Sequence, residues 1–330
     1  MSNKSDNAIL ESEASFEQLL GHVAARPMPS TEDVEMARNA VKAEWLAVTR
    51  KRKRRRQFVS LAAAASMLLT LALVIRFALT PPVIAVQVAA IEKSHGSITI
   101  YVMGEELQEA ADLLSISAGQ TIITGKESGL ALAWGGGGSL RIDANSRVVF
   151  LSDSAIELVS GAMYFDSMNR NVELHVRTKY GVIRHLGTQY MGRIDAESLA
   201  VSVREGRVSV DGLYFVGVAE RRQRLTFIGS ARPNVLSISP YGDAWRWVEL
   251  TAPQADFDDK TPIFEFLQWV ARETGLTIIF DDRHVERIVH KETLSGKFDA
   301  EPRVALGQGL LSASLTYVID PQKGEIIIAD

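Results

Sequence analysis

One long apolar stretch with a basic flank dominates the sequence. Residues 58–75 form a run of 18 residues without a charged side chain, and residues 50–56 before them are all Lys or Arg. As a helix, such a run rises about 27 Å, close to the roughly 30 Å hydrocarbon core of a membrane. Because basic flanks stay in the cytoplasm, the pattern predicts a single transmembrane helix over residues 58–79, with the C-terminal part exported.

Two alternatives to an uncleaved anchor can be weighed on the residues. A buried core helix of a soluble protein is the first, but such runs are usually shorter. A cleavable signal peptide is the second, but its basic region would be about 56 residues long, and Pro81-Pro82 follows the run instead of a small-residue cleavage site. The Arg55-Arg56 pair resembles a twin-arginine export signal, yet any run of seven basic residues contains such a pair. We therefore predict an uncleaved single-pass anchor.

Charge and cysteine content exclude several classes of partner and site. The chain has a net charge of −4 and no cysteine, so disulfides and thiolate metal sites are excluded. Residues 80–330 carry 24 Lys/Arg against 32 Asp/Glu. An acidic exported part repels phosphates, which predicts that nucleic acid is not a partner.

Residues 1–57 are predicted to form a helical cytoplasmic segment. Two apolar stripes recur at helical spacing, one on each of two short helices, and Ser30 with Asp33 forms a capping-box-like start for the second. The stripe residues that we consider for partner binding are Phe16, Leu19, Leu20, Val41 and Trp45. So short a segment buries little apolar area alone. A self-contained helical hairpin and a module completed by a cytoplasmic partner both remain open.

Residues 83–230 are predicted to form an all-β domain. Short alternating segments rich in β-branched residues follow one another and are separated by Gly, Asn, Asp and Ser. Six of these predicted strands are Ala155–Val159, Ala162–Phe165, Val182–His185, Tyr190–Arg193, Leu199–Arg204 and Arg207–Val210. Gly135–Gly138 is interpreted as a hairpin turn, because neither a Lys-Ser/Thr pair nor a helix follows it, as a phosphate-binding loop would require.

Residues 245–330 are predicted to form a compact α+β domain. Thr261-Pro262 starts a helix that Gly275 ends, a strand follows at Leu276–Phe280, and a second helix covers residues 301–313. Strands at Leu315–Ile319 and Glu325–Ala329 make a terminal hairpin. Mixed helices and strands in about 75 residues are typical of a small α+β fold.

No catalytic, cofactor-binding or metal-binding pattern stands out. The six histidines are scattered, without the spacing of metal ligands, and no nucleophile elbow is present. The sequence therefore predicts neither an enzyme that acts on an external substrate nor a cofactor. A membrane-tethered hydrolase lacks any supporting constellation.

Four motifs in the β domain carry a resemblance to a known family. They are IELVSGAMYFD at 156–166, HVRT at 175–178, LGTQY at 186–190 and VREGRV at 203–208. Their order and spacing resemble the FecR family of membrane-anchored sigma regulators, over roughly residues 85–212. One position departs from the family: Gly137-Gly138-Ser139 stands where the family usually has Asp-Gly-Ser, so that turn loses its carboxylate. The C-terminal part looks like a secretin/TonB short N-terminal-type domain, which serves protein–protein contact.

The resemblance implies an anti-sigma signal transducer of the bacterial inner membrane. Its periplasmic part would sense the periplasmic signalling domain of a TonB-dependent outer-membrane receptor, of which iron uptake is the family's usual association. Its cytoplasmic part would bind an extracytoplasmic-function sigma factor. The alternative is a structural envelope adaptor whose C-terminal domain docks a secretin or transporter without any transcriptional output.

The resemblance also suggests self-cleavage at the Gly187-Thr188 bond, because some FecR-family regulators are processed at such a pair. A Thr hydroxyl can attack the preceding carbonyl of a strained peptide and form an ester that water opens. His185 lies two residues upstream, but in a regular strand it shares a face with Gly187 and not with Thr188. The simpler interpretation is that Gly187 only makes a bend before the strand that follows.

Overall fold

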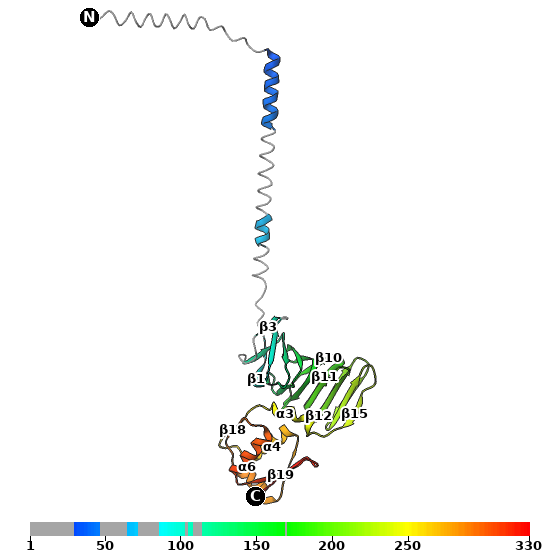
Figure 1. Ribbon diagram of the computed structural model, residues 1–330, viewed down its shortest axis with the longest axis vertical. Coiled ribbons are helices and arrows are strands. Elements are labelled where there is room, and N and C mark those ends of the chain that lie inside the picture. Colours follow the sequence, from blue (N-terminus) through cyan, green and yellow to red (C-terminus); the bar gives the residue numbers. More distant parts are fainter. Residues whose placement is uncertain (1–29, 47–64, 72–85, 103–104, 108–113, 169) are drawn as a thin grey trace, which may run out of the picture. The chain divides into compact units, whose positions relative to one another are not determined.

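A computed structural model describes residues 30–46, 65–71, 86–102, 105–107, 114–168 and 170–330. The chain divides into two compact units, residues 1–83 and 84–330. The described part of the first unit is helical, at residues 31–46 and 65–71 (Figure 1). The second unit contains a large β-sheet followed by an α+β region (Figure 1).

The helix at residues 31–46 begins with the predicted cap. The Ser30 Oγ accepts a hydrogen bond from the Asp33 backbone N–H at 3.1 Å, and its hydroxyl donates to Asp33 Oδ2 at 2.6 Å. These bonds occupy a donor that a helix start otherwise leaves without a partner. The capping-box prediction is therefore confirmed at Ser30.

The predicted transmembrane helix over residues 58–79 is wrong for this structure. Among the residues that the structure describes, no helix is both long and apolar enough to cross a membrane. Within the predicted span only residues 65–71 are described as helix.

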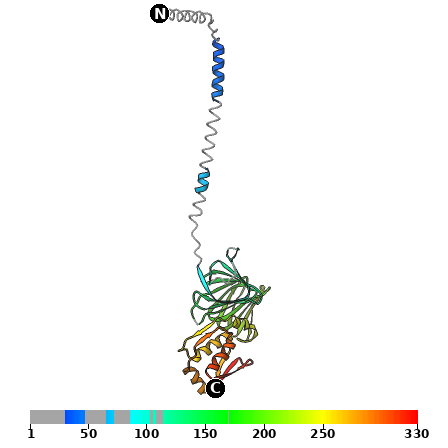
Figure 2. The ribbon, with the colours of Figure 1, turned by 60° about the vertical axis from the view of Figure 1, so that its left-hand side comes forward.

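The second unit is mostly β, with fifteen strands in one sheet. The sheet strands are β1 (Gln87–His95), β2 (Ile98–Val102), β3 (Glu105–Leu107), β4 (Ser115–Ser117), β5 (Gln120–Thr124), β6 (Gly129–Trp134), β7 (Ser139–Ile142), β8 (Arg147–Ser152), β9 (Ala155–Asp166), β10 (His175–Thr178), β11 (Gly181–Ile194), β12 (Ser198–Gly212), β13 (Val216–Glu220), β14 (Gln223–Ile228) and β15 (Asn234–Ser237). The main path runs β15-β14-β12-β11-β10-β9-β7-β6-β1-β4. Figures 1 and 2 show the strands curving, and their buried apolar side chains form one core cluster. We call residues 87–237 the β region.

Glycines predicted to separate strands lie inside continuous strands instead. The three pairs of short strands predicted from the sequence merge into β9, β11 and β12. Gly161, with φ +81°, accompanies a register shift between β8 and β9, and the β11–β12 ladder also shifts register. A β-bulge absorbs an extra residue without ending the strand, which is why local sequence suggested a break. The predicted turn at Gly135–Gly138 does connect two strands, β6 and β7.

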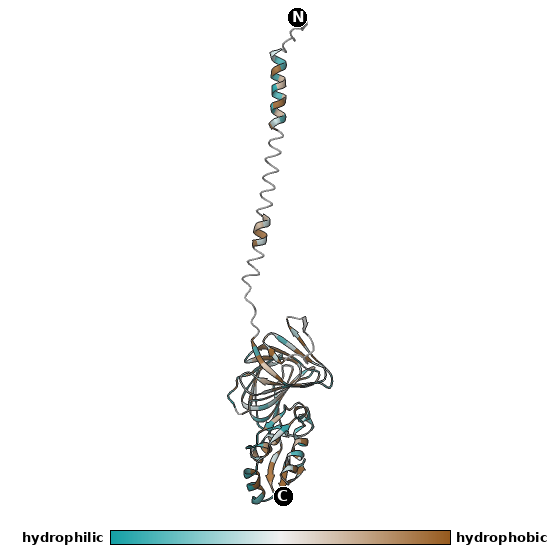
Figure 3. Ribbon diagram, turned by 90° about the vertical axis from the view of Figure 1, so that its left-hand side faces the viewer, coloured by the Kyte–Doolittle hydropathy of each residue, from teal (hydrophilic) through white to brown (hydrophobic). Residues whose placement is uncertain are grey.

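The α+β region, residues 243–329, follows the β region. Its elements are η2 (Asp243–Trp245), α3 (Arg246–Leu250), β16 (Ala255–Phe257), α4 (Ile263–Thr274), β17 (Thr277–Phe280), α5 (Arg283–Lys291), β18 (Gly296–Phe298), α6 (Pro302–Ser312), β19 (Thr316–Asp320) and β20 (Glu325–Ala329). Gly275 ends α4 in the left-handed conformation, as predicted. The order β17-β20-β19 places β20 in the centre, and Figure 3 shows its apolar residues between the helices. Ile326 and Ile328 of β20 are fully buried.

The α+β region covers one face of the sheet through buried charged side chains. Arg141 of β7 is fully buried and donates to both carboxylate oxygens of Glu273 of α4, at 2.7 and 2.9 Å. Arg204 of β12 donates to the carbonyl oxygens of Pro240 at 2.7 Å and Glu273 at 3.0 Å. A small apolar cluster joins the two regions at the same place, with Tyr164 edge-on to Trp245. The two regions therefore share a buried interface.

Removal of the Arg141 guanidinium tests how much this interface stabilises the unit. Arg141→Leu leaves Glu273 buried without its partner, and we expect a loss of about 3–5 kcal/mol in the free energy of unfolding of residues 84–330. Arg207→Leu is the matched control, because its pair with Glu220 is 61% and 57% exposed, so we expect a loss of about 1 kcal/mol or less. Urea denaturation measures both. Equal, small losses would contradict a tightly coupled interface.

Candidate functional site

The Gly187-Thr188 pair lies in a β-bulge of β11. The ladder with β12 pairs Leu186 with Arg207 and Gln189 with Glu205, so Gly187 and Thr188 together stand opposite Gly206. Two residues opposite one is the arrangement of a bulge, which bends the strand and redirects its side chains. The structure thus places the predicted bond in an irregularity within a strand, and not in a bend before one.

Only glycine fits the backbone on both sides of this bulge. Gly187 has φ +56° and Gly206 has φ +80°, both in the left-handed region that other residues rarely adopt. A Cβ on Gly206 would lie 2.4 Å from the Gly187 carbonyl oxygen and 2.6 Å from Thr188 Cγ2. Gly206 of the opposing strand therefore lies so close to the Gly187 carbonyl, the group that a nucleophile would attack, that no Cβ fits between them.

The side chain and backbone of Thr188 are held differently. Its hydroxyl oxygen is buried and has no hydrogen-bond partner among the described residues. Its backbone N–H donates to Ser167 Oγ at 3.0 Å, and its carbonyl oxygen accepts from the Ser167 N–H at 3.1 Å. An unsatisfied buried hydroxyl is costly and persists where surrounding contacts hold it in place. The Thr188 hydroxyl is therefore not engaged in a hydrogen bond with the described residues, whereas the Thr188 backbone is held by Ser167.

The bulge changes which side chains share a face. Thr188 and Tyr190 are two residues apart and both buried, and the Tyr190 ring stacks on His185 with centroids 5.6 Å apart. Alternation in a regular strand predicted that His185 and Thr188 face opposite ways. That expectation holds for a regular strand, and the bulge adds one residue between His185 and Thr188. Both His185 ring nitrogens and the Thr188 hydroxyl oxygen are buried.

His185 is neutral at ordinary pH. Burial, and to a smaller extent the nearby His175, lowers the pKa of its imidazole to about 4. Both ring nitrogens are buried without a hydrogen-bond partner among the described residues. The ring also packs on Phe165, with centroids 5.0 Å apart. A neutral imidazole retains a lone pair that can accept a proton.

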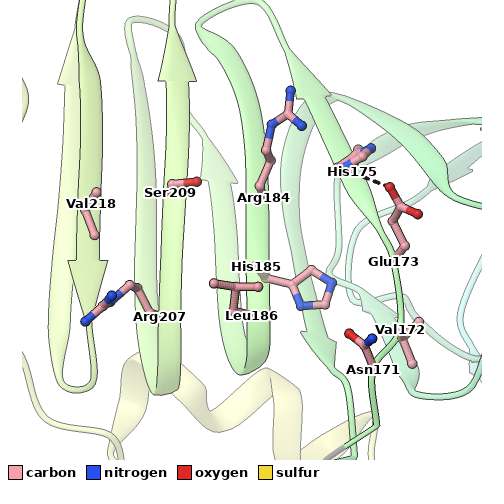
Figure 4. Close-up of a pocket in the computed structure, with 10 residues that line it drawn as sticks. All are labelled: Asn171, Val172, Glu173, His175, Arg184, His185, Leu186, Arg207, Ser209 and Val218. Atoms are coloured by element: carbon pink, nitrogen blue, oxygen red, sulfur yellow. Dashed lines mark ion pairs between the residues drawn. The ribbon is translucent and has the colours of Figure 1, made fainter.

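A pocket of about 490 Å³ opens beside the residues that precede the bond. His185 and Leu186 of β11 form one side, the segment with Asn171 and Val172 forms another, and Arg207 extends it along β12. Figure 4 shows the His185 ring between its own strand and that segment. Gly187 itself is exposed. The pocket gives water access to the amino side of the Gly187-Thr188 bond.

The sequence did not predict Asp166 or Arg272, which hold the backbone around the Gly187-Thr188 bond from strand β9 and from the α+β region. Asp166, at the end of β9, accepts hydrogen bonds from Gln189 Nε2 at 2.9 Å, from the Met168 N–H at 2.7 Å and from two nitrogens of Arg272. A signal was present, since Asp166 closes the motif at 156–166 and Gly206 lies in the motif at 203–208. Nothing in the sequence connected Arg272 to either motif.

The arrangement suits an acyl shift within the chain. The Thr188 hydroxyl adds to the Gly187 carbonyl carbon, its proton passes to the Thr188 nitrogen, and that C–N bond breaks to leave an ester. Water then opens the ester, which gives a Gly187 carboxylate and a free amine on Thr188. Each step uses atoms present at the bulge and water, with no cofactor.

The residues predicted for partner binding in the first unit are described only in part. Val41 and Trp45 lie one turn apart on the helix at 31–46 and are 68% and 64% exposed. Together with Ala37, Arg38 and Lys42 they line a shallow surface hollow. Phe16, Leu19 and Leu20 lie outside the described residues. The structure therefore leaves both the hairpin and the partner-binding interpretation open.

Comparison with known families identifies the β region. Residues 120–209 match the family described as FecR protein. The resemblance indicated by the four motifs is thereby confirmed over these residues, which contain both Gly187-Thr188 and Gly206. We refer to this part as the FecR-like region.

Similarity to individual proteins is weaker. No curated protein shows a significant match to the chain. Two crystal structures of a candidate anti-sigma factor from Parabacteroides distasonis are similar, with 19% and 18% identity and TM-scores of 0.34 and 0.33. Each match covers 64% of this chain and 98% of the other. At these scores the likeness does not establish a shared overall fold.

The lowered pKa of His185 predicts a pH-dependent loss of stability. The unfolded chain takes up a proton near an ordinary histidine pKa of about 6.5, whereas the folded chain resists it until about pH 4. Stability is therefore full above roughly pH 6.5 and falls as pH drops toward 4, by at most about 3 kcal/mol.

The experiment compares His185→Phe with wild type by urea denaturation across that pH range. Phenylalanine keeps the ring packing on Phe165 and Tyr190 but cannot titrate, so the pH-dependent loss should shrink. His284→Gln, at an exposed histidine of α5, should retain the wild-type slope. An unchanged slope in His185→Phe would contradict a buried neutral imidazole.

Proposed function

We propose that the chain is an anti-sigma regulator that relays an envelope signal to a sigma factor. The observation that carries this proposal is the FecR match over residues 120–209, which holds the Gly187-Thr188 bulge. The four sequence motifs support the same family from the residues themselves. The candidate anti-sigma factor from Parabacteroides distasonis adds no structural argument, because its TM-score is only 0.34.

The finer assignments belong to this proposal as well. We assign the helical first unit to binding an extracytoplasmic-function sigma factor. We assign the second unit to a periplasmic position, where the α+β region would contact the signalling domain of a TonB-dependent receptor. Support comes from the resemblance of the C-terminal sequence to domains used in protein–protein contact. The alternative remains an envelope adaptor without transcriptional output.

Sigma-factor binding separates the regulator from the adaptor. Trp45→Ala in residues 1–49 removes a large exposed aromatic side chain, often worth about 2 kcal/mol or more at the centre of an interface, or roughly 30-fold in affinity. Asn39→Ala, on the opposite side of the helix, is the matched control and should bind as wild type. Capture of a purified extracytoplasmic-function sigma factor, with circular dichroism to follow helicity, measures both.

The outcomes of this binding experiment are distinct. Weaker capture with unchanged helicity supports direct contact through Trp45. Loss of helicity together with capture would make Trp45 part of a helical hairpin core. No capture of any sigma factor by the wild-type segment would favour the adaptor.

We propose further that the second unit cleaves itself between Gly187 and Thr188. The buried hydroxyl without a partner, the left-handed Gly187 and the adjacent pocket support this assignment. We assign the proton acceptor to His185, whose neutral ring has both nitrogens buried without a hydrogen-bond partner among the described residues. The bond would then divide β11 while the sheet holds both fragments together.

Substitution of Thr188 tests the nucleophile. In cells, wild-type protein should be recovered as two fragments whose new ends are Gly187 and Thr188, identified by mass spectrometry. Thr188→Ala should remain intact, and Thr188→Ser, which keeps the hydroxyl, should still be cleaved. Cleavage at the same bond in Thr188→Ala would point to a separate protease. Recovery of both fragments only from the cytoplasmic fraction would contradict the periplasmic assignment.

A further inference from the structure

The Gly187-Thr188 bond is connected to the α+β region by hydrogen bonds and one peptide link. Ser167 holds the Thr188 backbone through two hydrogen bonds, at 3.0 and 3.1 Å. The residue before it, Asp166, is bound by Arg272, from the last turn of α4. Only one peptide link therefore separates the residue that binds Arg272 from the residue that binds Thr188.

The Arg272 contact holds a buried charge in place. Asp166 is 1% exposed, so its carboxylate depends on protein donors. Arg272 supplies two of them, from Nε at 2.7 Å and from Nη2. The others come from Gln189 Nε2 and the Met168 N–H. Without the guanidinium the carboxylate loses its counter-charge, and a buried charge that has lost its partner forces its surroundings to rearrange.

The residues on both sides of the bond meet at the same carboxylate. Gln189 follows Thr188 directly, and its side chain bonds both Asp166 and, at 3.4 Å, the Arg272 carbonyl oxygen. The Thr188 backbone is thus hydrogen-bonded to Ser167, the neighbour of Asp166. Gln189, the residue after Thr188, is hydrogen-bonded to Asp166 itself. Displacement of Asp166 therefore shifts the nucleophile and the leaving nitrogen together.

We propose that Arg272 is a positioning residue that couples the docking of the α+β region to the geometry of the Gly187-Thr188 bond, through Asp166 and Ser167. Docking holds the Thr188 backbone in the bulge through Ser167, with the Thr188 hydroxyl oxygen buried. A partner that lifts α4 from the sheet releases Asp166 and lets the bulge relax. The cleavage part of this inference rests on the proposed self-cleavage; the coupling itself does not.

The experiment uses the full chain with two arginine variants. Arg272→Gln removes the guanidinium from Asp166. Arg303→Gln is the matched control, because Arg303 makes a comparable two-nitrogen pair with buried Glu249 inside the α+β region, at 2.7 and 3.1 Å. Loss of alignment between reacting groups slows a reaction steeply, so we expect cleavage to be at least about tenfold slower in Arg272→Gln and little changed in Arg303→Gln.

A second measurement does not need cleavage. In a Thr188→Ala background the bond stays intact, and amide hydrogen exchange of the peptide that contains residue 188 and Gln189 reports how firmly the bulge is held. We expect exchange there to become about tenfold faster with Arg272→Gln and to stay unchanged with Arg303→Gln. Exchange of β20 in the same samples reports whether the α+β region is still folded.

Ser167→Ala keeps the inference testable if Arg272→Gln unfolds the α+β region. It removes the acceptor of the Thr188 N–H and leaves every contact of α4 in place, so exchange at residue 188 should again rise. Unchanged exchange in Arg272→Gln with a folded α+β region, or in Ser167→Ala, would overturn the coupling. If Arg272→Gln speeds exchange at residue 188 but the wild-type chain is never cleaved, the coupling is retained and the proposed self-cleavage is rejected.

Discussion

The buried ion pair between Arg141 and Glu273 is the interaction on which the second unit depends. Arg141 lies on a central strand, where it has no route to water, and burial alone would lower the pKa of its guanidinium. The Glu273 carboxylate reverses that effect and holds the pKa above its ordinary value. A charge placed so deeply requires its partner, because an unpaired buried ion costs several kcal/mol. The FecR-like sheet and the α+β region are therefore two parts of one folded unit.

The same interface explains why a bond in the sheet can respond to the α+β region. Arg204 lies over the ring of Trp245 at 4.4 Å and binds the end of α4, while Arg272 reaches Asp166 from the same helix. These contacts are directional, and one of them ends at Asp166, the neighbour of the Ser167 that binds the Thr188 backbone. A small rigid-body movement of α4 would break several charged contacts at once, because such contacts lose strength steeply with misalignment.

Glycine was informative in the sequence, but its meaning depended on the sheet. Gly161 and Gly187 suggested breaks between short strands, whereas both lie in bulges inside long ones. A bulge and a turn look alike in sequence, since both need a left-handed backbone. Only the pairing partner distinguishes them: Gly206 can stand opposite Gly187 because it carries no Cβ, which would collide with the Gly187 carbonyl oxygen. Helix α5 was missed because few of its residues are apolar.

Local pattern alone determined the β-rich centre, the mixed C-terminal elements, the FecR resemblance and the choice of Gly187-Thr188, because alternation, capping and motif spacing are properties of neighbouring residues. The apolar run at 58–75, read by itself, led to a transmembrane helix that the described residues do not contain. Tertiary structure alone decided that Arg141, Arg204 and Asp166 are buried. Charged side chains at alternate strand positions normally face water, and here the α+β region, distant in sequence, covers them. Sequence separation of more than a hundred residues between Asp166 and Arg272 hides that contact from any local rule.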